Sequence, residues 1–264
     1  MNTFQITSHL RTAFRKIGTD VRAVAPRPRP WRLAPTPPVS VRVQGGVFEL
    51  TLPAGGLACV LDCRKDERHL LLSLQAPRAA AERFLCGFDE RHWFVAGVTA
   101  SSSVPAAKES LIPAAVRQVI LRSGLRHADR FRRRTSAFLR QGEWFFVPTE
   151  TTVNPLNIHR HEPLIRPGGG KAHVVDELVR GVGEMVWHHQ LHAPAGVTDA
   201  QFRALPEAVR TGKGWSQRLR VAREGSVLAR GAVRHPDHAT VYLPTWHRVF
   251  INNKQRPASL GFLD

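Results

Sequence analysis

Cysteine is scarce in this chain of 264 residues, with only Cys59, Cys63 and Cys86 present. Three thiols are too few for a disulfide framework, and none has the paired C-x2-C spacing of a cysteine-based zinc site. Free thiols in a reducing cytoplasm are the simplest expectation. No apolar run approaches the roughly 18–20 residues that span a bilayer. The N-terminus lacks the apolar segment of a secretory signal peptide. The sequence therefore predicts a cytoplasmic protein without membrane contact.

Acidic residues are also scarce: 21 Asp and Glu face 38 Lys and Arg, giving a formal net charge of +17. Most of these cations are Arg, whose planar guanidinium suits phosphate oxygens. Such an excess makes a polyanion the expected partner, and nucleic acid is the first candidate. A basic surface without a polyanionic partner is the alternative. Hydrophobic residues make up 42% of the chain, which indicates a folded core and excludes wholesale disorder.

Alternating apolar patterns favour strands through much of the chain, so we expect an α+β fold. The predicted units are an N-terminal helix (1–24), a Pro/Arg-rich linker or arm (25–38), a small α+β domain (39–138) and a β-rich, histidine-containing domain (139–264). The last domain is expected to be barrel- or sandwich-like. Apolar residues at helical spacing, among them Leu10 and Phe14, could dock the N-terminal helix on a protein partner. Because residues 1–38 show no core strand, we expect the rest to fold without them.

Three further helices are predicted from local patterns. Residues 77–86 have a proline near the first turn, residues 104–123 end before Gly124 at the C-cap, and residues 198–211 begin after Thr198 as N-cap. Residues 149–172 look irregular.

Two arginine-rich segments are candidates for phosphate contact. The linker would be extended, with Arg27 and Arg29 along a phosphate backbone and Trp31 stacked on a base; an ordinary spacer is the alternative. The second segment would present several guanidinium groups on a helix, unless it is a solvated charge run beside Asp129. Its cations are Arg126, Arg130, Arg132, Arg133 and Arg134.

Histidine is frequent, with 13 residues, and imidazole is both a common transition-metal ligand and a general base near neutral pH. Two strand patterns flank Pro236 and Asp237, which predicts a hairpin that holds His235 and His238 close together. His173 follows a glycine run that could fold back on them and bring Lys171 near a ligand. These three histidines are candidate ligands for zinc, manganese or non-haem iron.

Asp237 could complete this candidate site as a ligand, or could orient a histidine. Without a metal, His235 or His238 could act as acid or base on a phosphodiester while arginines hold its charge. The zinc signatures H-E-x-x-H and H-x-E…C-x-x-C are absent, and so is a phosphate-binding loop of the G-x-x-x-x-G-K-[ST] type. A separate structural role for each histidine is the alternative.

Four segments carry a resemblance: GEWFFVP (142–148), GGGKAH (168–173), LARGAVRHPDH (228–238) and TWHRVFIN (245–252). Over residues 141–255, their order resembles uncharacterised bacterial and phage-encoded proteins with a histidine-containing β-rich domain. The region is also similar to cupin-type barrels, whose metal histidines lie on two separated motifs. The chain departs from the cupin pattern because H-x-H followed by Glu is missing after Gly170. The resemblance implies a β-rich fold and carries no activity.

The sequence thus predicts a nucleic-acid-binding protein, with RNA ahead of DNA because arginines and loop-borne aromatics suit unstacked bases. A histidine-dependent phosphodiester-cleaving enzyme, with or without a metal, is the second hypothesis, with His173, His235, His238 and Asp237 as candidate catalytic residues. A basic scaffold subunit of a larger nucleoprotein assembly is the third.

Overall fold

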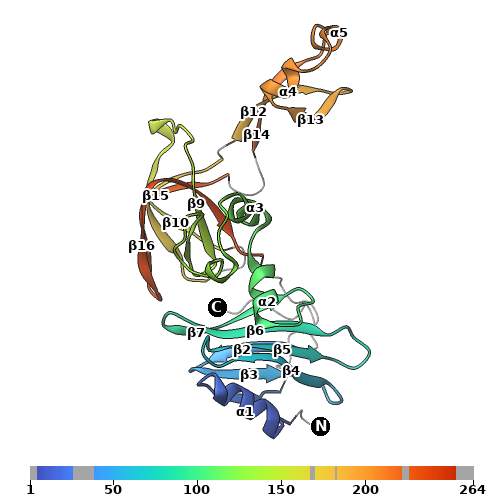
Figure 1. Ribbon diagram of the computed structural model, residues 1–264, viewed down its shortest axis with the longest axis vertical. Helices are drawn as coiled ribbons and strands as arrows, with labels where there is room; N and C mark the ends of the chain where they lie inside the picture. The colour runs from blue at the N-terminus through green and yellow to red at the C-terminus, as the bar shows by residue number, and fades with distance from the viewer. Residues whose placement is uncertain (1–4, 26–38, 167–169, 182, 222–225, 254–264) are drawn as a thin grey trace, which may run out of the picture.

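The computed structural model describes residues 5–25, 39–166, 170–181, 183–221 and 226–253. Hydrogen bonds join the strands of these segments into four sheets, and helices are few and short, which confirms the expected α+β, strand-rich class. Figure 1 shows two bodies along the long axis, with a narrow arm projecting from the second. No helix within the described segments is long and apolar enough to cross a membrane. The predicted contacts of Arg27, Arg29 and Trp31 lie outside the described residues.

The first domain combines two small sheets, with strand orders β1-β3-β2 and β4-β5-β6-β7. The tight turn at Gly45 and Gly46 joins β2 to β3 in the predicted hairpin. The elements of this domain are α1 (Ser8–Lys16), β1 (Val21–Ala23), β2 (Ser40–Gln44), β3 (Val47–Thr51), β4 (Leu57–Arg64), β5 (His69–Gln75), β6 (Glu82–Asp89), β7 (His92–Val98) and α2 (Val104–Leu111).

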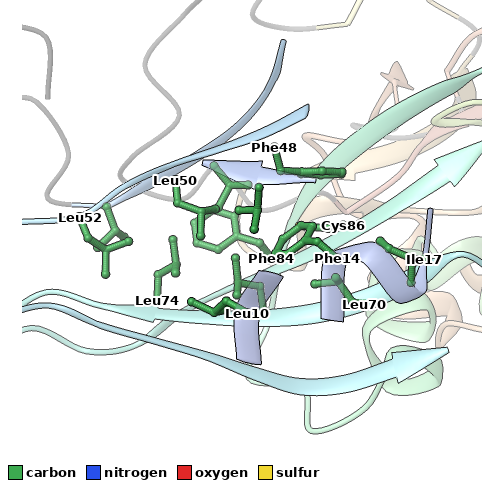
Figure 2. Packing of buried hydrophobic residues seen from close by; sticks show 14 of the residues in the cluster. Leu10, Phe14, Ile17, Phe48, Leu50, Leu52, Leu70, Leu74, Phe84 and Cys86 are labelled. Carbon is green, nitrogen blue, oxygen red and sulfur yellow. The ribbon is translucent and has the colours of Figure 1, made fainter. Parts of the chain in front are cut away.

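Helix α1 is part of the first domain's core rather than a separate unit. Leu10, Phe14 and Ile17 are at most 1% exposed, and they face Phe48 and Leu70 in Figure 2. Strand β1 follows the helix and pairs in parallel with β3. The apolar face that the sequence offers to a protein partner is therefore covered by the helix's own domain. The premise that residues 1–38 hold no core strand is wrong, because β1 and the buried face of α1 belong to this domain; the expectation that the rest folds without them loses that support.

The helix predicted over residues 77–86 is wrong. Pro77 and Arg78 form a turn, and β6 begins at Glu82. Strand β6 lies between β5 and β7, and its side chains Phe84 and Cys86 are fully buried. Pairing on both edges and burial on both faces override the local helix preference of the alanines.

The helix predicted over residues 104–123 is two helices, α2 and α3 (Ala114–Arg122). Pro113 disfavours helical geometry in the residue before it, and Ile112 is accordingly extended, with ψ of 125°. Helix α2 packs on the first domain through Val104 and Ala107. Helix α3 packs on the second domain through Val116 and Ile120. The change from one core to the other therefore falls at Pro113, earlier than the predicted boundary at residue 138.

The second domain is a six-stranded antiparallel sheet with strand order β10-β11-β15-β16-β9-β8. Gln141 of the edge strand β8 donates hydrogen bonds to the carbonyl oxygens of Val233 (3.1 Å) and Ala239 (2.6 Å), so the sheet curls back on itself. This curl agrees with the barrel-like expectation. The strands are β8 (Leu139–Gln141), β9 (Trp144–Pro148), β10 (His159–Leu164), β11 (His173–Val179), β15 (Leu228–His235) and β16 (His238–Ile251). The 3-10 helices are η1 (His127–Asp129) and η2 (Pro155–Asn157).

The region 149–172, expected to be irregular, contains β10, so that expectation is wrong in part. The projecting arm is inserted between β11 and β15. It consists of β12 (Gly183–His189), β13 (Ala193–Val197), α4 (Asp199–Arg203), α5 (Glu207–Arg210) and β14 (Ser216–Val221). Thr198 caps α4 as predicted. The single helix expected over 198–211 is wrong, because Pro206 separates α4 from α5.

Candidate metal centre

Three imidazoles meet at one end of the curled sheet. His235 ends β15, His238 begins β16, and the two face each other across the hairpin turn. His173 begins β11, next to the same end of β15, because Val174 pairs with Arg234. The predicted hairpin is thus confirmed, and the strand register adds His173 to the pair.

The distances between these rings are short. The His173 and His235 rings are stacked with centroids 4.1 Å apart, and the His235 and His238 centroids are 4.7 Å apart. One nitrogen from each ring lies within 4.8 Å of the others. Three such atoms lie within about 2.8 Å of a common point, compared with a zinc–nitrogen bond of about 2.0–2.1 Å. A contraction of less than 1 Å per ring, roughly, would complete a three-nitrogen site.

His173 is buried without hydrogen-bond partners. Its side chain is 1% exposed, and neither ring nitrogen has a partner in the described part of the chain. Burial, together with the neighbouring His235 and His238 rings, lowers the pKa of His173 to about 3. Burial also lowers the pKa of His238, although the carboxylate of Glu90 opposes this change. Both rings are therefore neutral near pH 7, which is the form that binds metals.

The carboxylate of the turn residue Asp237 is engaged by a lysine. Both carboxylate oxygens accept hydrogen bonds from Lys171 Nζ, at 2.8 and 2.9 Å. This hydrogen bond, more than any other interaction, lowers the pKa of Asp237. The ion pair ties the segment before His173 to the hairpin, and it engages Lys171, which the sequence analysis expects near a ligand, with an acid of the protein itself. The sequence predicts Asp237 as a metal ligand or as a carboxylate that orients a histidine. In the structure its carboxylate instead binds Lys171 and so holds this residue against the hairpin.

The backbone of Asp237 does contact the cluster, because its N–H donates to Nδ1 of His235 at 3.1 Å. An Nδ1 that accepts a hydrogen bond places the proton of the neutral ring on Nε2. Ligation through either nitrogen of His235 therefore requires this hydrogen bond to open. A bound ion would replace it at Nδ1, or would move the proton from Nε2 to Nδ1.

The first domain adds two residues that sequence reasoning missed, Glu90 and His92. Glu90 lies in the β6–β7 turn, 7% exposed at its side chain, with Oε1 3.6 Å from Nδ1 of His238. Its other oxygen accepts the backbone N–H of Ala239 at 2.6 Å. The ring of His92 packs edge-on against His238, with centroids 5.0 Å apart. No local pattern marks either residue, because both reach the cluster across the domain boundary.

Gly142 makes room for His238. Its φ is +55°, and a Cβ built on it would lie 2.7 Å from Nε2 of His238. Only glycine combines this left-handed conformation with the close approach of a ring.

The arginine-rich segment is not helical, which corrects the predicted helical footprint. After η1 the chain turns back, and the acids nearby engage most of its cations. Arg126 and Arg132 share Asp129, at 2.9 and 3.0 Å. Arg133 spans the domain boundary to Asp89 (2.5 Å) and Glu90 (2.6 Å). Three of the five arginines predicted to bind phosphate in this segment are therefore paired with acids of the protein itself. Arg130 and Arg134 have no acidic partner among the described residues.

A cavity of about 430 Å³ lies between the two domains and reaches the cluster through His238, Gly142 and His92. Six cations and two acids are among its lining residues. They are Lys108, Arg130, Arg132, Arg133, Arg140 and Arg166, with Asp89 and Glu143. Burial by itself raises the pKa of Asp89. The charges of Arg140 and Arg133 lower this pKa by more, so that the net pKa is below the ordinary value.

Other histidines lie apart from the cluster. His247 is buried farther along β16, and its Nδ1 is 2.7 Å from the carbonyl oxygen of Thr245. His159 and His161 are exposed on β10. His189 lies in the arm with both nitrogens hydrogen-bonded.

Comparisons with protein-family models, with curated proteins and with solved structures found no match to this chain. The resemblance of residues 141–255 to histidine-containing β-rich proteins therefore stays a prediction. What the cluster does must be argued from its own geometry.

Proposed function

We propose that the protein is a phosphodiester-cleaving enzyme that depends on a divalent transition metal, with His173, His235 and His238 as the protein ligands. The observation that carries this proposal is His173, which is buried with both ring nitrogens unpartnered and stands against two further imidazoles. A buried polar group without a hydrogen bond costs about 1–3 kcal/mol. A bound ion would offset this cost at His173, whereas at His235 it would replace an existing hydrogen bond.

An ion held by these three histidines would supply an acidified water, whose pKa such ions lower toward 7. In the reaction, the water oxygen would lose a proton and form a bond to phosphorus, the ester P–O bond would break, and the leaving oxygen would take up a proton. His92 is the residue that we assign to proton transfer, because it lines the cavity beside His238 without belonging to the three-histidine set. Glu90 would hold the His238 ring in orientation through Nδ1.

A nucleic acid is the proposed substrate. The formal charge of +17 favours a polyanion, and the cluster opens on a cavity with more cations than acids. RNA stays ahead of DNA as the expected substrate, for the reason given from the sequence.

Nucleic-acid binding without cleavage is the second candidate function. The exposed guanidinium group of Arg134 favours it, because this residue has no acidic partner among the described residues. In the third hypothesis, a scaffold subunit, the N-terminal helix docks on a partner; the burial of its apolar face within its own domain argues against that role.

The decisive experiment starts from protein stripped with a chelator and reconstituted with Zn²⁺, Mn²⁺, Fe²⁺ or Co²⁺. We expect one bound ion per chain, a Co²⁺ absorption spectrum of nitrogen ligation, and cleavage of single-stranded RNA that EDTA abolishes. His173→Gln should lose both the ion and the cleavage. The matched control is His159→Gln, in the exposed part of β10, which should lose neither.

Retention of the Co²⁺ spectrum in His173→Gln would contradict the ligand assignment. A bound ion without cleavage of RNA or DNA would instead favour the non-catalytic candidate. The backbone amide of Asp237 gives an independent signal, since its hydrogen bond to His235 must open: its NMR resonance should shift on addition of Zn²⁺.

A cytoplasmic location belongs to this proposal. All three cysteines are free, with Cys86 buried and Cys59 exposed. Unpaired thiols suit a reducing compartment, and detection of a Cys59–Cys63 bridge in protein from its native cell would contradict this location.

A further inference from the structure

The cavity between the domains has cations that its own acids do not engage. Arg133 is paired with Asp89, and Lys108 is paired with Glu67. Arg132 is paired with Asp129. Arg130 and Arg166 have no acidic partner among the described residues, and the contact of Arg140 with Asp89 is long, at 3.8 Å. Three arginines that line the cavity therefore have no acidic partner or only a distant one among the described residues.

Two of these groups also have buried N–H bonds without an acceptor. The Nε atoms of Arg130 and Arg140 are inaccessible to solvent and have no hydrogen-bond partner within the described segments. A buried donor without a partner is costly, and more so when it is charged. Because solvent does not reach these two Nε atoms, an anion in the cavity would instead contact other atoms of the arginines that line it, and a tetrahedral phosphate offers several oxygens to a planar guanidinium fork.

The volume of the cavity limits what carries that phosphate. About 430 Å³ lies within the roughly 300–1,000 Å³ of small-molecule sites. A nucleic-acid duplex, whose major groove alone is about 12 Å wide, is far larger. The cavity has room for one nucleotide unit, and it places that unit against His238, at the edge of the candidate metal centre.

We propose that this cavity is a phosphate subsite for a single nucleotide unit, entered by a free nucleotide or by the end of a single strand, with Arg130, Arg140 and Arg166 as its anion-binding groups. This inference rests on the proposed function, because it identifies the substrate of the same site as a strand end. Phosphate binding itself needs no metal.

The test is isothermal titration calorimetry in the presence of EDTA, with inorganic phosphate and with adenosine 5′-monophosphate. We expect one site per chain in the wild-type protein. Arg130→Gln and Arg166→Gln should each weaken binding about tenfold or more, since each removes a charged hydrogen-bond donor. Arg126→Gln is the matched control, because this residue has the same chemistry, lies on the same segment as Arg130, and is absent from the cavity wall. Its affinity should be unchanged.

An equal loss in Arg126→Gln, or no binding by the wild-type protein, would overturn the inference. Arg166 lies on a different segment from Arg130, so Arg166→Gln alone decides the question if Arg130→Gln melts early. Fluorescence anisotropy then separates the sources of the phosphate. A labelled single strand with a terminal phosphate should bind about tenfold more tightly than the same strand with a hydroxyl end or than a blunt duplex. Equal binding of all three would refute the strand-end subsite.

The Co²⁺ spectrum keeps the two proposals apart. Phosphate binding without Co²⁺ binding would refute the metal centre and leave the subsite standing. Co²⁺ binding and RNA cleavage without phosphate binding would refute only the subsite.

Discussion

The arm and the curled sheet each hold a set of three histidines, and the two sets differ in the hydrogen bonds of their buried rings. The sets are His188, His189 and His192 in the arm and His173, His235 and His238 in the sheet. In the arm, buried His189 accepts the backbone N–H groups of Leu191 (3.1 Å) and His192 (3.2 Å) at Nδ1. Its Nε2 is 3.1 Å from the carbonyl oxygen of Lys213. In the sheet, His173 is more deeply buried, and neither nitrogen has a partner in the described residues.

This difference separates a structural histidine from one that is ready for a ligand. The hydrogen bonds of His189 fix its tautomer and organise the loop between β12 and β13, so the ring has no lone pair to offer. His173 has a free lone pair and two imidazole neighbours. The cost of removing its ring nitrogens from water is not offset by any hydrogen bond within the described residues. The number of histidines in each set does not show which set could bind a ligand. The hydrogen bonds of the buried rings in the structure do.

The largest expected effect comes from replacing each buried ring with leucine. His173→Leu should lower Co²⁺ affinity by about a hundredfold or more, and the metal-free variant should be as stable as wild type or more stable, since it removes an unsatisfied polar group. His189→Leu should keep the metal affinity and lose about 1–3 kcal/mol of unfolding free energy, because it leaves backbone groups unpaired. Co²⁺ titration and urea unfolding measure the two quantities. The comparison fails if both variants change stability in the same direction.

A smaller effect is expected from a methyl group at Gly142. Both Gly142 and Gly124 have positive φ, +55° and +63°, so an alanine at either position strains the backbone by about 1–2 kcal/mol. A Cβ at Gly142 meets Nε2 of His238 at 2.7 Å, whereas a Cβ at Gly124 meets nothing within 4 Å. Gly142→Ala should therefore lower metal affinity about tenfold beyond the common strain, and Gly124→Ala should not. Equal metal affinities in the two variants would remove His238 from the ligand set.

A further effect, which accumulates gradually with pH, is the pH dependence of stability in the metal-free protein. The pKa of His173 is lowered from 6.5 to about 3 on folding. Between these values the unfolded chain binds a proton that the folded chain does not, so the free energy of unfolding falls as the pH is lowered. His173 alone contributes a slope of about 1.4 kcal/mol per pH unit. Urea unfolding at several pH values in this window should show a shallower slope in His173→Leu than in wild type; identical slopes would mean that His173 gains a proton or a partner in the folded protein.

Local chemistry predicts part of the site well. The Pro236–Asp237 turn between two alternating patterns places His235 opposite His238, because a two-residue hairpin loop fixes the register of its closing pair. The glycine run before Lys171 leads directly to His173, and the Lys171–Asp237 ion pair joins this segment to the hairpin. Asp129 next to the arginine run was a local signal that those cations could be neutralised, and it engages two of them.

The rest depends on contacts between distant segments. Glu90 reaches the backbone of Ala239 across 149 positions of sequence, and no periodicity encodes such an approach. The helix expected over residues 77–86 is wrong for this reason, because sheet pairing overrides the alanines of β6. The division of residues 104–123 into α2 and α3 has a local cause in Pro113, and only the assignment of the two helices to different cores depends on the fold.

The sequence by itself determined the strand-rich class, the basic charge and the hairpin with its two histidines, because these follow from composition, period-two patterning and turn chemistry over a few residues. Only the tertiary structure decided which histidines remain unpartnered, that Glu90, His92 and Gly142 surround His238, and which arginines face a cavity. These properties arise from burial and from the curl of one sheet against a second domain. Hydrogen-bond satisfaction depends on neighbours in space, and neighbours in space are set by the whole fold.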